Sequence, residues 1–169
     1  HLYNLPTTGL RFFTVYGPFG REDMAYYKFL EQIRCSKKIT IYGSTKSIRS
    51  FTYIDDVTRG IERAIDNIPY ADKNWDPDSP NPNTSSAPYR VYNIGNQRPV
   101  KLLEYIKVIE KCVGKESIKE FLPQQAGDVI ATHADISEST SDLGYGPTTI
   151  LEKGMSAFVS WYKSYYKIV

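Results

Sequence analysis

Apolar and polar positions along the chain alternate between the rhythms of strands and helices. Residues 7–15 form a near-continuous apolar run after Arg11, which predicts a buried strand of a parallel sheet. Residues 24–34 predict a helix, because apolar side chains recur at three-residue spacing at Met24, Tyr27, Leu30 and Ile33. The remaining strands are predicted over residues 39–42, 50–54, 89–94 and 118–122, with an extended segment over 128–135. The remaining helices are predicted over residues 55–67, 102–113, 137–143 and 150–166.

This alternation of strands and helices predicts the α/β class for the whole chain. Local signals mark two of the helix ends. Asp55 or Asp56 is expected to cap the helix that follows, and Gly114 stands at the C-cap position after residue 113. The side chains expected to face inward from the helix over 55–67 are Val57, Ile61, Ala64 and Ile65.

Residues 69–88 interrupt the pattern. The segment holds five prolines among Asn, Asp and Ser clusters, and it is longer than most connections in compact domains. We expect a long surface loop here. Two interpretations of it stay open: a functional lid, or a tolerated insertion.

Composition narrows the classes of function. The 169 residues suffice for one domain with its own core. Lys and Arg number 21 against 19 Asp and Glu, without a dense basic run, so we expect no nucleic-acid partner. No apolar run approaches the ~20 residues of a membrane span and no signal peptide is visible, so we expect a cytoplasmic protein.

The cysteines and histidines show no metal-binding or disulfide pattern. Cys35 and Cys112 form no CxxC spacing, and we expect two buried thiols in a reducing compartment. The two histidines do not cluster with them, so no metal site is expected.

Residues 9–24 carry the most informative pattern. The apolar run breaks at Tyr16-Gly17-Pro18 into a polar loop that contains Arg21. In α/β proteins, ligands bind beyond the carboxyl ends of the parallel strands. An arginine there offers bidentate hydrogen bonds to a carboxylate or phosphate, and a solvated loop arginine is the open alternative.

Five short blocks of sequence follow one another along the chain: residues 5–18 (LPTTGLRFFTVYGP), 49–56 (RSFTYIDD), 92–96 (YNIGN), 127–129 (GDV) and 161–162 (WY). Together they resemble the NAD-dependent epimerase/dehydratase family of extended short-chain dehydrogenases/reductases, in its UDP-glucuronate 4-epimerase branch. The resemblance covers almost the whole chain, apart from the loop over 69–88.

The resemblance implies a Rossmann-type fold, NAD as cofactor and a UDP-sugar as substrate. In that family the matching blocks lie past the middle of the protein. We therefore expect residues 1–169 to be the C-terminal part: the last parallel strands of the dinucleotide-binding domain plus the small substrate-binding lobe. The full-length protein is expected to be a homodimer.

Two motifs that the family needs are absent from the sequence. No Gly-rich turn of the type G-x-G-x-x-G occurs, although such a turn binds the dinucleotide pyrophosphate. The catalytic tyrosine with a lysine four residues later is matched only by Tyr42 and Lys46. These lie at a Gly/Ser turn, so the two side chains would not share a helical face. We expect the genuine pair upstream of His1, and no activity from the chain alone.

The substrate residues that the resemblance implies fall into groups. Thr14 and Arg21 would bind the uronate carboxylate, and Arg49 would reach the diphosphate. The uracil would lie against Thr40, Tyr42, Met24 and Phe29. A surface position for Arg49, and plain core packing for Met24 and Phe29, stay open as alternatives.

The remaining implied contacts involve both substrate and cofactor. Gln125 stands where epimerases of neutral sugars often carry a phosphate-binding arginine. Asp128 would accept hydrogen bonds from the ribose or uridine, and Thr132 stands where some galactose-type epimerases have a tyrosine that faces the hexose. Phe12 and Val15 would meet the nicotinamide ring, through backbone contacts.

The resemblance implies a parent enzyme that interconverts UDP-glucuronate and UDP-galacturonate by NAD-dependent oxidation and reduction at C4. Two alternatives stay open. One is another NAD-dependent dehydratase or decarboxylase of nucleotide sugars. The other is that the chain by itself is a non-catalytic module that binds nucleotide sugars or serves assembly.

Overall fold

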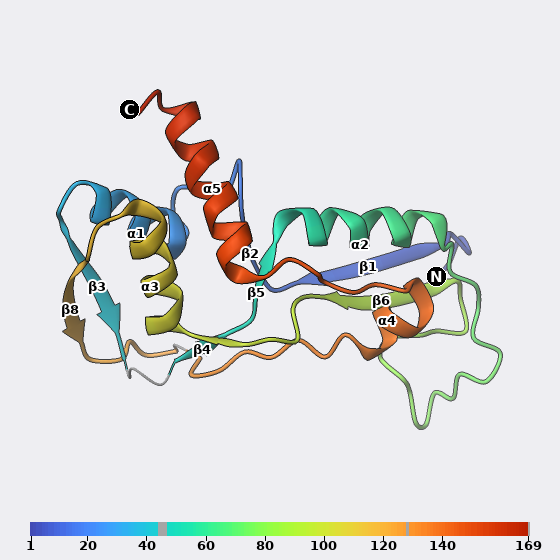
Figure 1. The fold of residues 1–169 in the computed structure, drawn as a ribbon. Coiled ribbons are helices and arrows are strands. Elements are labelled where there is room, and N and C mark those ends of the chain that lie inside the picture. The colour runs from blue at the N-terminus through green and yellow to red at the C-terminus, as the bar shows by residue number, and fades with distance from the viewer. Residues whose placement is uncertain (44–46, 128, 169) are drawn as a thin grey trace.

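The computed structural model describes residues 1–43, 47–127 and 129–168, and Figure 1 shows how their elements are arranged. Strands and helices alternate along the chain, as the sequence pattern predicts. The helices are α1 (Ala25–Arg34), α2 (Ile54–Asp66), α3 (Leu102–Val113), α4 (Ser137–Leu143) and α5 (Leu151–Tyr165). The strands are β1 (Thr7–Phe12), β2 (Thr14–Tyr16), β3 (Lys38–Tyr42), β4 (Ile48–Arg49), β5 (Phe51–Tyr53), β6 (Tyr89–Ile94), β7 (Val100–Lys101) and β8 (Ile118–Leu122).

The strands pair two by two. Three pairs are parallel, namely β1 with β6, β2 with β5, and β3 with β8, whereas β4 and β7 are antiparallel. Parallel strands joined through helices are the arrangement of a Rossmann-type α/β protein. The fold class predicted from the sequence is confirmed.

One apolar core lies between the β1–β6 pair and its helices (Figure 1). Helix α2 runs along this pair, and α4 contacts β6. The close approach of α2 leaves little room for a side chain at Gly60, because a Cβ there would lie 3.1 Å from the side chains of Ile94 and Tyr145. The buried side chains of this core are Val57, Ala64, Tyr92, Ile94, Ala134, Ile136, Leu143 and Tyr145.

A second core joins α1, α3 and α5 with β3 and β5. It is rich in aromatic rings that meet edge to face, such as Tyr26 against Phe158 with ring centroids 4.9 Å apart. Tyr16 of β2 and Tyr53 of β5 belong to it and meet at 5.7 Å. The β2–β5 pair therefore brings the end of the first apolar run into this aromatic core.

Most of the predicted boundaries are confirmed. The structure bounds β6, α3, β8 and α4 at the predicted residues, and Gly114 takes the left-handed conformation at the end of α3, with φ of 78°. Helix α5 buries Met155, Phe158, Val159 and Tyr162 on one face. These elements have strong local signals, so the sequence pattern sufficed to locate them.

The single buried strand predicted over residues 7–15 is wrong. The chain breaks at Phe13 into β1 and β2, which pair with different partners, and β1 is only partly covered. Leu10, Phe13 and Val15 all pack on the core beside the β1–β6 pair, whereas Tyr16, just after the run, enters the aromatic core, and Phe12 stays 49% exposed. The predicted strand over 50–54 also ends earlier, since Ile54 already belongs to α2.

Three side-chain predictions are corrected as well. Neither Asp55 nor Asp56 caps α2: Tyr53 is the N-cap residue, and both carboxylates lie in the first turn, where they favour the helix dipole. Ile65 is 70% exposed instead of facing inward. Cys35 is exposed and Cys112 half-buried, so the expected pair of buried thiols is not found.

Residues 69–88 form the long surface segment that the composition predicts. It has no helix or named strand, and it is closed by an isolated bridge between Ala71 and Pro88. Asp72, Asp76 and Asn81 each accept a hydrogen bond from a backbone N–H two residues on, which stabilises its turns.

Candidate functional site

A cavity of about 390 Å³ lies between α1, β3 and the β4–β5 segment. Six of the predicted substrate residues line it: Thr14, Met24, Phe29, Thr40, Tyr42 and Arg49. They come from four segments that are separate in the sequence. The remaining lining residues are Ala25, Lys28, Ile41, Ser47, Phe51 and Leu102.

Strand alternation and helix periodicity place these side chains. In β3, Ile39 and Ile41 are buried in the aromatic core, and Thr40 and Tyr42 therefore point to the opposite face. On α1, Lys28 follows Met24 by four positions and so shares its face of the helix. Neighbouring Phe29 is 7% exposed and serves both the core and the cavity wall.

The ring of Phe51 forms an aromatic wall of the cavity and is supported by a buried tyrosine on its other side. The ring of Phe51 stacks on that of Tyr105, with centroids 3.8 Å apart and an interplanar angle of 13°. Tyr105 is fully buried, and burial raises the pKa of its hydroxyl well above the usual range, with Tyr16 adding to the shift. The phenol is therefore neutral and acts as packing, while Phe51 presents a fixed apolar surface.

Arg49 is held by backbone carbonyls. Its Nη1 donates hydrogen bonds to the carbonyl oxygens of Ile48 and Ile130, each at 3.0 Å. The segment around Ile130 is itself tied to β4, because the Ile48 backbone N–H donates to the Ile130 carbonyl at 3.0 Å. A guanidinium supported in this way is pre-oriented to meet an anion in the cavity.

Thr132 lies beside β4 and is hydrogen-bonded to the backbone of that segment. Its hydroxyl accepts a hydrogen bond from the Ser50 backbone N–H at 3.1 Å, and its own N–H donates to the Ile48 carbonyl. Thr132 is not among the residues that line the cavity. Its predicted place opposite the hexose stays a prediction.

The charge of the cavity is one-sided. Lys28 and Arg49 are the charged residues of its described lining, and that lining contains no carboxylate. Apolar surface with two cations and the hydroxyls of Thr14, Thr40 and Ser47 suits an anion that carries a planar apolar group. The arrangement can bind such a ligand, but the described lining offers no pair of groups for acid/base chemistry.

Arg21 is placed outside this lining. Its side chain is 77% exposed and forms a bidentate ion pair with Asp23, in which Nε lies 3.0 Å from Oδ1. The hydrogen bond raises the pKa of Arg21 and lowers that of Asp23. The structure does not bring Arg21 together with Thr14, so their joint carboxylate site stays a prediction.

Other predicted residues are dispersed or undescribed. Gln125 is exposed, whereas Asp128 and Lys46 lie outside the described residues. The role of Asp128 therefore stays a prediction, as does the rejection of the Tyr42–Lys46 pair. Phe12 is half-exposed at the end of β1 and could cover one face of a cofactor ring. Val15 packs with the β1–β6 core and stands opposite Thr52 in the β2–β5 pair, and its backbone contact with the nicotinamide stays a prediction.

The fit of these residues to NAD is partial. Exposed apolar surface at Phe12 suits a nicotinamide ring, and β1 and β6 end where parallel strands bind such ligands. The Gly-rich turn for the pyrophosphate is absent from the sequence. The chain can thus contribute one wall of a dinucleotide site.

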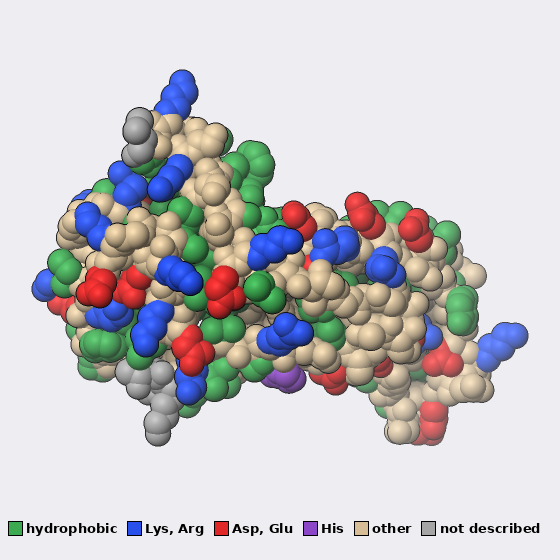
Figure 2. Space-filling view, in the orientation of Figure 1, with side chains coloured by type: hydrophobic (Ala, Val, Ile, Leu, Met, Phe, Trp, Pro, Cys, Tyr) green, Lys and Arg blue, Asp and Glu red, His purple; other side chains and the backbone are tan. Residues whose placement is uncertain are grey.

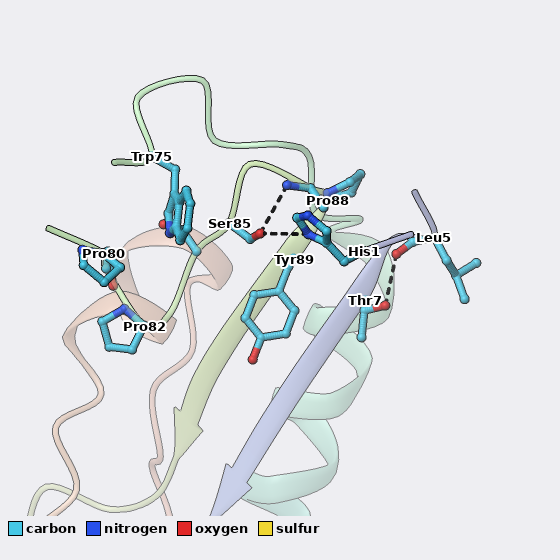
Figure 3. Close-up of a pocket in the computed structure, with 12 residues that line it drawn as sticks. His1, Leu5, Thr7, Trp75, Pro80, Pro82, Ser85, Pro88 and Tyr89 are labelled. Atoms are coloured by element: carbon cyan, nitrogen blue, oxygen red, sulfur yellow. Dashed lines mark hydrogen bonds between the residues drawn. The ribbon is translucent and has the colours of Figure 1, made fainter. Parts of the chain in front are cut away.

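A larger cavity of about 520 Å³ lies under the loop over 69–88, beside the starts of β1 and β6 (Figure 3). Trp75, Pro80 and Pro82 of the loop face His1 and Tyr89 across it. None of the predicted site residues lines this cavity. The indole N–H of Trp75 has no partner, but it is sealed from solvent, so a ligand in the cavity would not reach it.

Sequence reasoning missed six residues of the smaller cavity: Ala25, Lys28, Ile41, Ser47, Phe51 and Leu102. Lys28 had a usable signal, because its four-residue offset from Met24 puts the two on one helix face. Leu102 had none, since its place at the site depends on a contact with a distant segment, in which its backbone N–H donates to the Ser47 carbonyl at 2.9 Å.

The rest of the described surface adds no second chemistry. Within the ranges that the structure covers, no cluster of three His, Cys, Asp or Glu could hold a metal ion. Basic and acidic side chains are interspersed over the face shown in Figure 2. None of the helices in the described part of the chain has the length and apolar character to cross a membrane.

Comparison with known proteins shows the family of the chain. Residues 1–95 match the model of the NAD dependent epimerase/dehydratase family. The chain is 46% identical to Protein CapI of Staphylococcus aureus over 167 residues, which are 99% of this chain and 50% of that protein. It is 41% identical to a probable UDP-glucuronate 4-epimerase of Rhizobium meliloti, over 99% of this chain and 49% of that protein.

A solved structure shares the fold. It is the UDP-glucuronic acid 4-epimerase of Bacillus cereus in complex with UDP-glucuronic acid and NAD, with a TM-score of 0.79 and 34% identity. The match covers 97% of this chain and 47% of that one. The chain spans about half the length of the curated relatives that it matches.

Proposed function

The chain belongs to the NAD-dependent epimerase/dehydratase family, and from this premise we propose that it forms the substrate-binding half of a nucleotide-sugar epimerase. The substrates we assign are UDP-glucuronate and UDP-galacturonate. One observation carries the proposal: six residues predicted as substrate ligands line a single cavity that has two cations and no carboxylate in its described lining. The names of the relatives support the choice of sugar.

The chain's own residues bind and orient the substrate. Met24 and Phe29 offer apolar surface to the uracil, and Thr40 and Tyr42 supply polar groups at its edge. Arg49, held by two carbonyls, binds the diphosphate. Immobilising the nucleotide at several points fixes where its sugar lies, and such positioning lowers the entropic part of the barrier.

NAD, when bound, would accept hydride from C4 of the sugar and return it to the other face. This chain would provide the wall formed by Phe12 and the backbone of Val15. The proton transfer at the C4 hydroxyl is assigned to a Tyr-x-x-x-Lys pair supplied by residues outside this sequence. We therefore propose that the chain alone binds substrate without turning it over.

Arg21 is proposed to select the uronate. A guanidinium that already forms a bidentate pair with Asp23 has the geometry to accept a sugar carboxylate in its place. An exposed pair contributes little stability, so exchanging one carboxylate for another costs little.

Titration calorimetry with the 169-residue chain tests the binding function. We expect heat on adding UDP, UDP-glucose or UDP-glucuronate, and a loss of affinity of about tenfold or more in Arg49→Met, the size of a charge-assisted hydrogen bond. Absence of heat with all three ligands would overturn the proposal. Incubation with NAD+ and UDP-glucuronate should yield no UDP-galacturonate, and measurable turnover would contradict the assigned division of labour.

A further inference from the structure

Lys28 is the lining residue whose role the proposed nucleotide site does not explain. It lies in the first half of α1, one turn after Met24, and it lines the cavity. The described lining contains no carboxylate that could pair with it. Within the described residues, Lys28 forms no ion pair, in contrast to Lys38 and Lys119, which pair with Glu120 and Glu110. Its acidic neighbour is Asp23, whose pKa is lowered chiefly by the hydrogen bond from Arg21 and also by the charge of Lys28, and which lies outside the cavity lining.

The two cations of the cavity differ in how they are held. Arg49 is part-buried and braced by the carbonyls of Ile48 and Ile130. Lys28 is exposed, and its flexible four-carbon stem lets the ammonium group adjust to a ligand. One fixed fork and one adjustable point charge can bind two neighbouring anionic groups at once.

The charges also distinguish between nucleotides. In a nucleoside diphosphate joined to a sugar, each phosphate is esterified and carries one negative charge, so the diphosphate carries two. Free UDP carries a further charge on its terminal phosphate near neutral pH, because the second pKa of a phosphate monoester lies at about 6. Two cations without a carboxylate match the doubly esterified diphosphate.

We propose that Lys28 is the second phosphate-binding residue of this cavity and that, with Arg49, it tunes the site to diphosphate diesters. This inference rests on the proposed function. The two cations then divide the work: Arg49 orients one phosphate, and Lys28 neutralises the other. Substitution of either should weaken the binding of UDP-glucose, whereas the affinity for uridine should stay the same.

The test compares Lys28→Met with Arg49→Met and with Lys153→Met, an exposed lysine on α5 that serves as control. Methionine has a helix propensity close to that of lysine, so α1 should remain intact. Dissociation constants are measured by calorimetry for UDP-glucose and for uridine. UDP-glucose is used because its neutral sugar leaves Arg21 out of the comparison.

We expect Lys28→Met to weaken UDP-glucose binding by about tenfold, Lys28→Arg to restore most of it, and Lys153→Met to change nothing. Unchanged binding in Lys28→Met together with weakened binding in Arg49→Met would overturn the role of Lys28 and leave the proposed function standing. An equal loss for uridine would show a merely structural effect and would also overturn it. If the unsubstituted chain does not bind UDP-glucose, both proposals fail.

Discussion

The carboxylate of Asp56 accepts a hydrogen bond from the backbone N–H of Thr149 at 3.1 Å, although 93 positions separate the two residues. The same carboxylate accepts a bond from the Thr148 backbone N–H at 3.2 Å and pairs with Arg59. Asp56 is completely buried. It therefore fastens the first turn of α2 to the segment that leads into α5, and so connects the two cores.

Replacing Asp56 by alanine should destabilise the protein by about 3 kcal/mol, because its buried carboxylate accepts hydrogen bonds from the backbone N–H groups of Thr148 and Thr149 and pairs with Arg59, and all three contacts are lost. Asp55→Ala is the matched control, since Asp55 lies in the same turn and is exposed. Urea denaturation gives both values. Equal effects of the two substitutions would show that the loss comes from the helix dipole and not from the buried contacts.

Gly154→Ala should destabilise the helix packing by about 1–3 kcal/mol, although alanine favours helices. The added Cβ would meet the Tyr16 hydroxyl and would lie 2.8 Å from the Tyr53 ring, both in the aromatic core. Gly146→Ala is the control, because no atom lies within 4 Å of its Cβ position. If Gly154→Ala melts at or above the temperature of the unsubstituted chain, the close packing of Gly154 against Tyr16 and Tyr53 is contradicted.

The free energy of unfolding should fall at acid pH through Glu110, which joins the end of α3 to β8. Burial raises the pKa of Glu110, but hydrogen bonds from Lys119 and Ser117 outweigh it, and the pKa lies below its usual value. A depressed pKa means that the folded protein binds this proton more weakly than the unfolded chain. The contribution is therefore complete above the unfolded pKa of about 4.3 and is lost as the pH falls through the folded value.

Denaturation free energies at pH 7 and pH 3 check this sign. Glu110→Gln should lower stability at pH 7 and reduce the difference between the two pH values, because its amide does not titrate. Glu116→Gln, at an exposed glutamate nearby, should leave the difference unchanged. If the difference in unfolding free energy between pH 7 and pH 3 is as large in Glu110→Gln as in the unsubstituted chain, the difference comes from other carboxylates.

If the full-length protein is the proposed epimerase, Arg21→Ala should reduce its kcat/KM for UDP-glucuronate by about 100-fold while the binding of UDP-glucose stays within about twofold, since only the uronate offers a carboxylate to the guanidinium. Arg98→Ala, at another exposed loop arginine, is the control. Unchanged discrimination between the two sugars would remove Arg21 from the site and would leave the pair with Asp23 as a surface contact.

The cavity shows how far the sequence can be taken. Thr14, Met24, Phe29, Thr40, Tyr42 and Arg49 were assigned to one ligand through the family resemblance, and the structure brings these six together. Arg21 was assigned with Thr14, but it lies on a loop where its exposed side chain pairs with Asp23, two positions away. In a helix or strand, the periodicity of the element fixes the direction of each side chain. In a loop, the direction of a side chain such as that of Arg21 depends on which groups lie nearby in the folded protein.

By itself the sequence determined the α/β class, the bounds of α3, α4, β6 and β8, and the left-handed end at Gly114. These depend on residues three or four positions apart, or on one backbone conformation, and such signals are local. Only the tertiary structure decided that residues 7–15 divide at Phe13, that Asp56 binds the segment before α5, and that Leu102 borders the cavity. Each of these depends on which distant segments pack together, because burial and hydrogen-bond partners are properties of the assembled core.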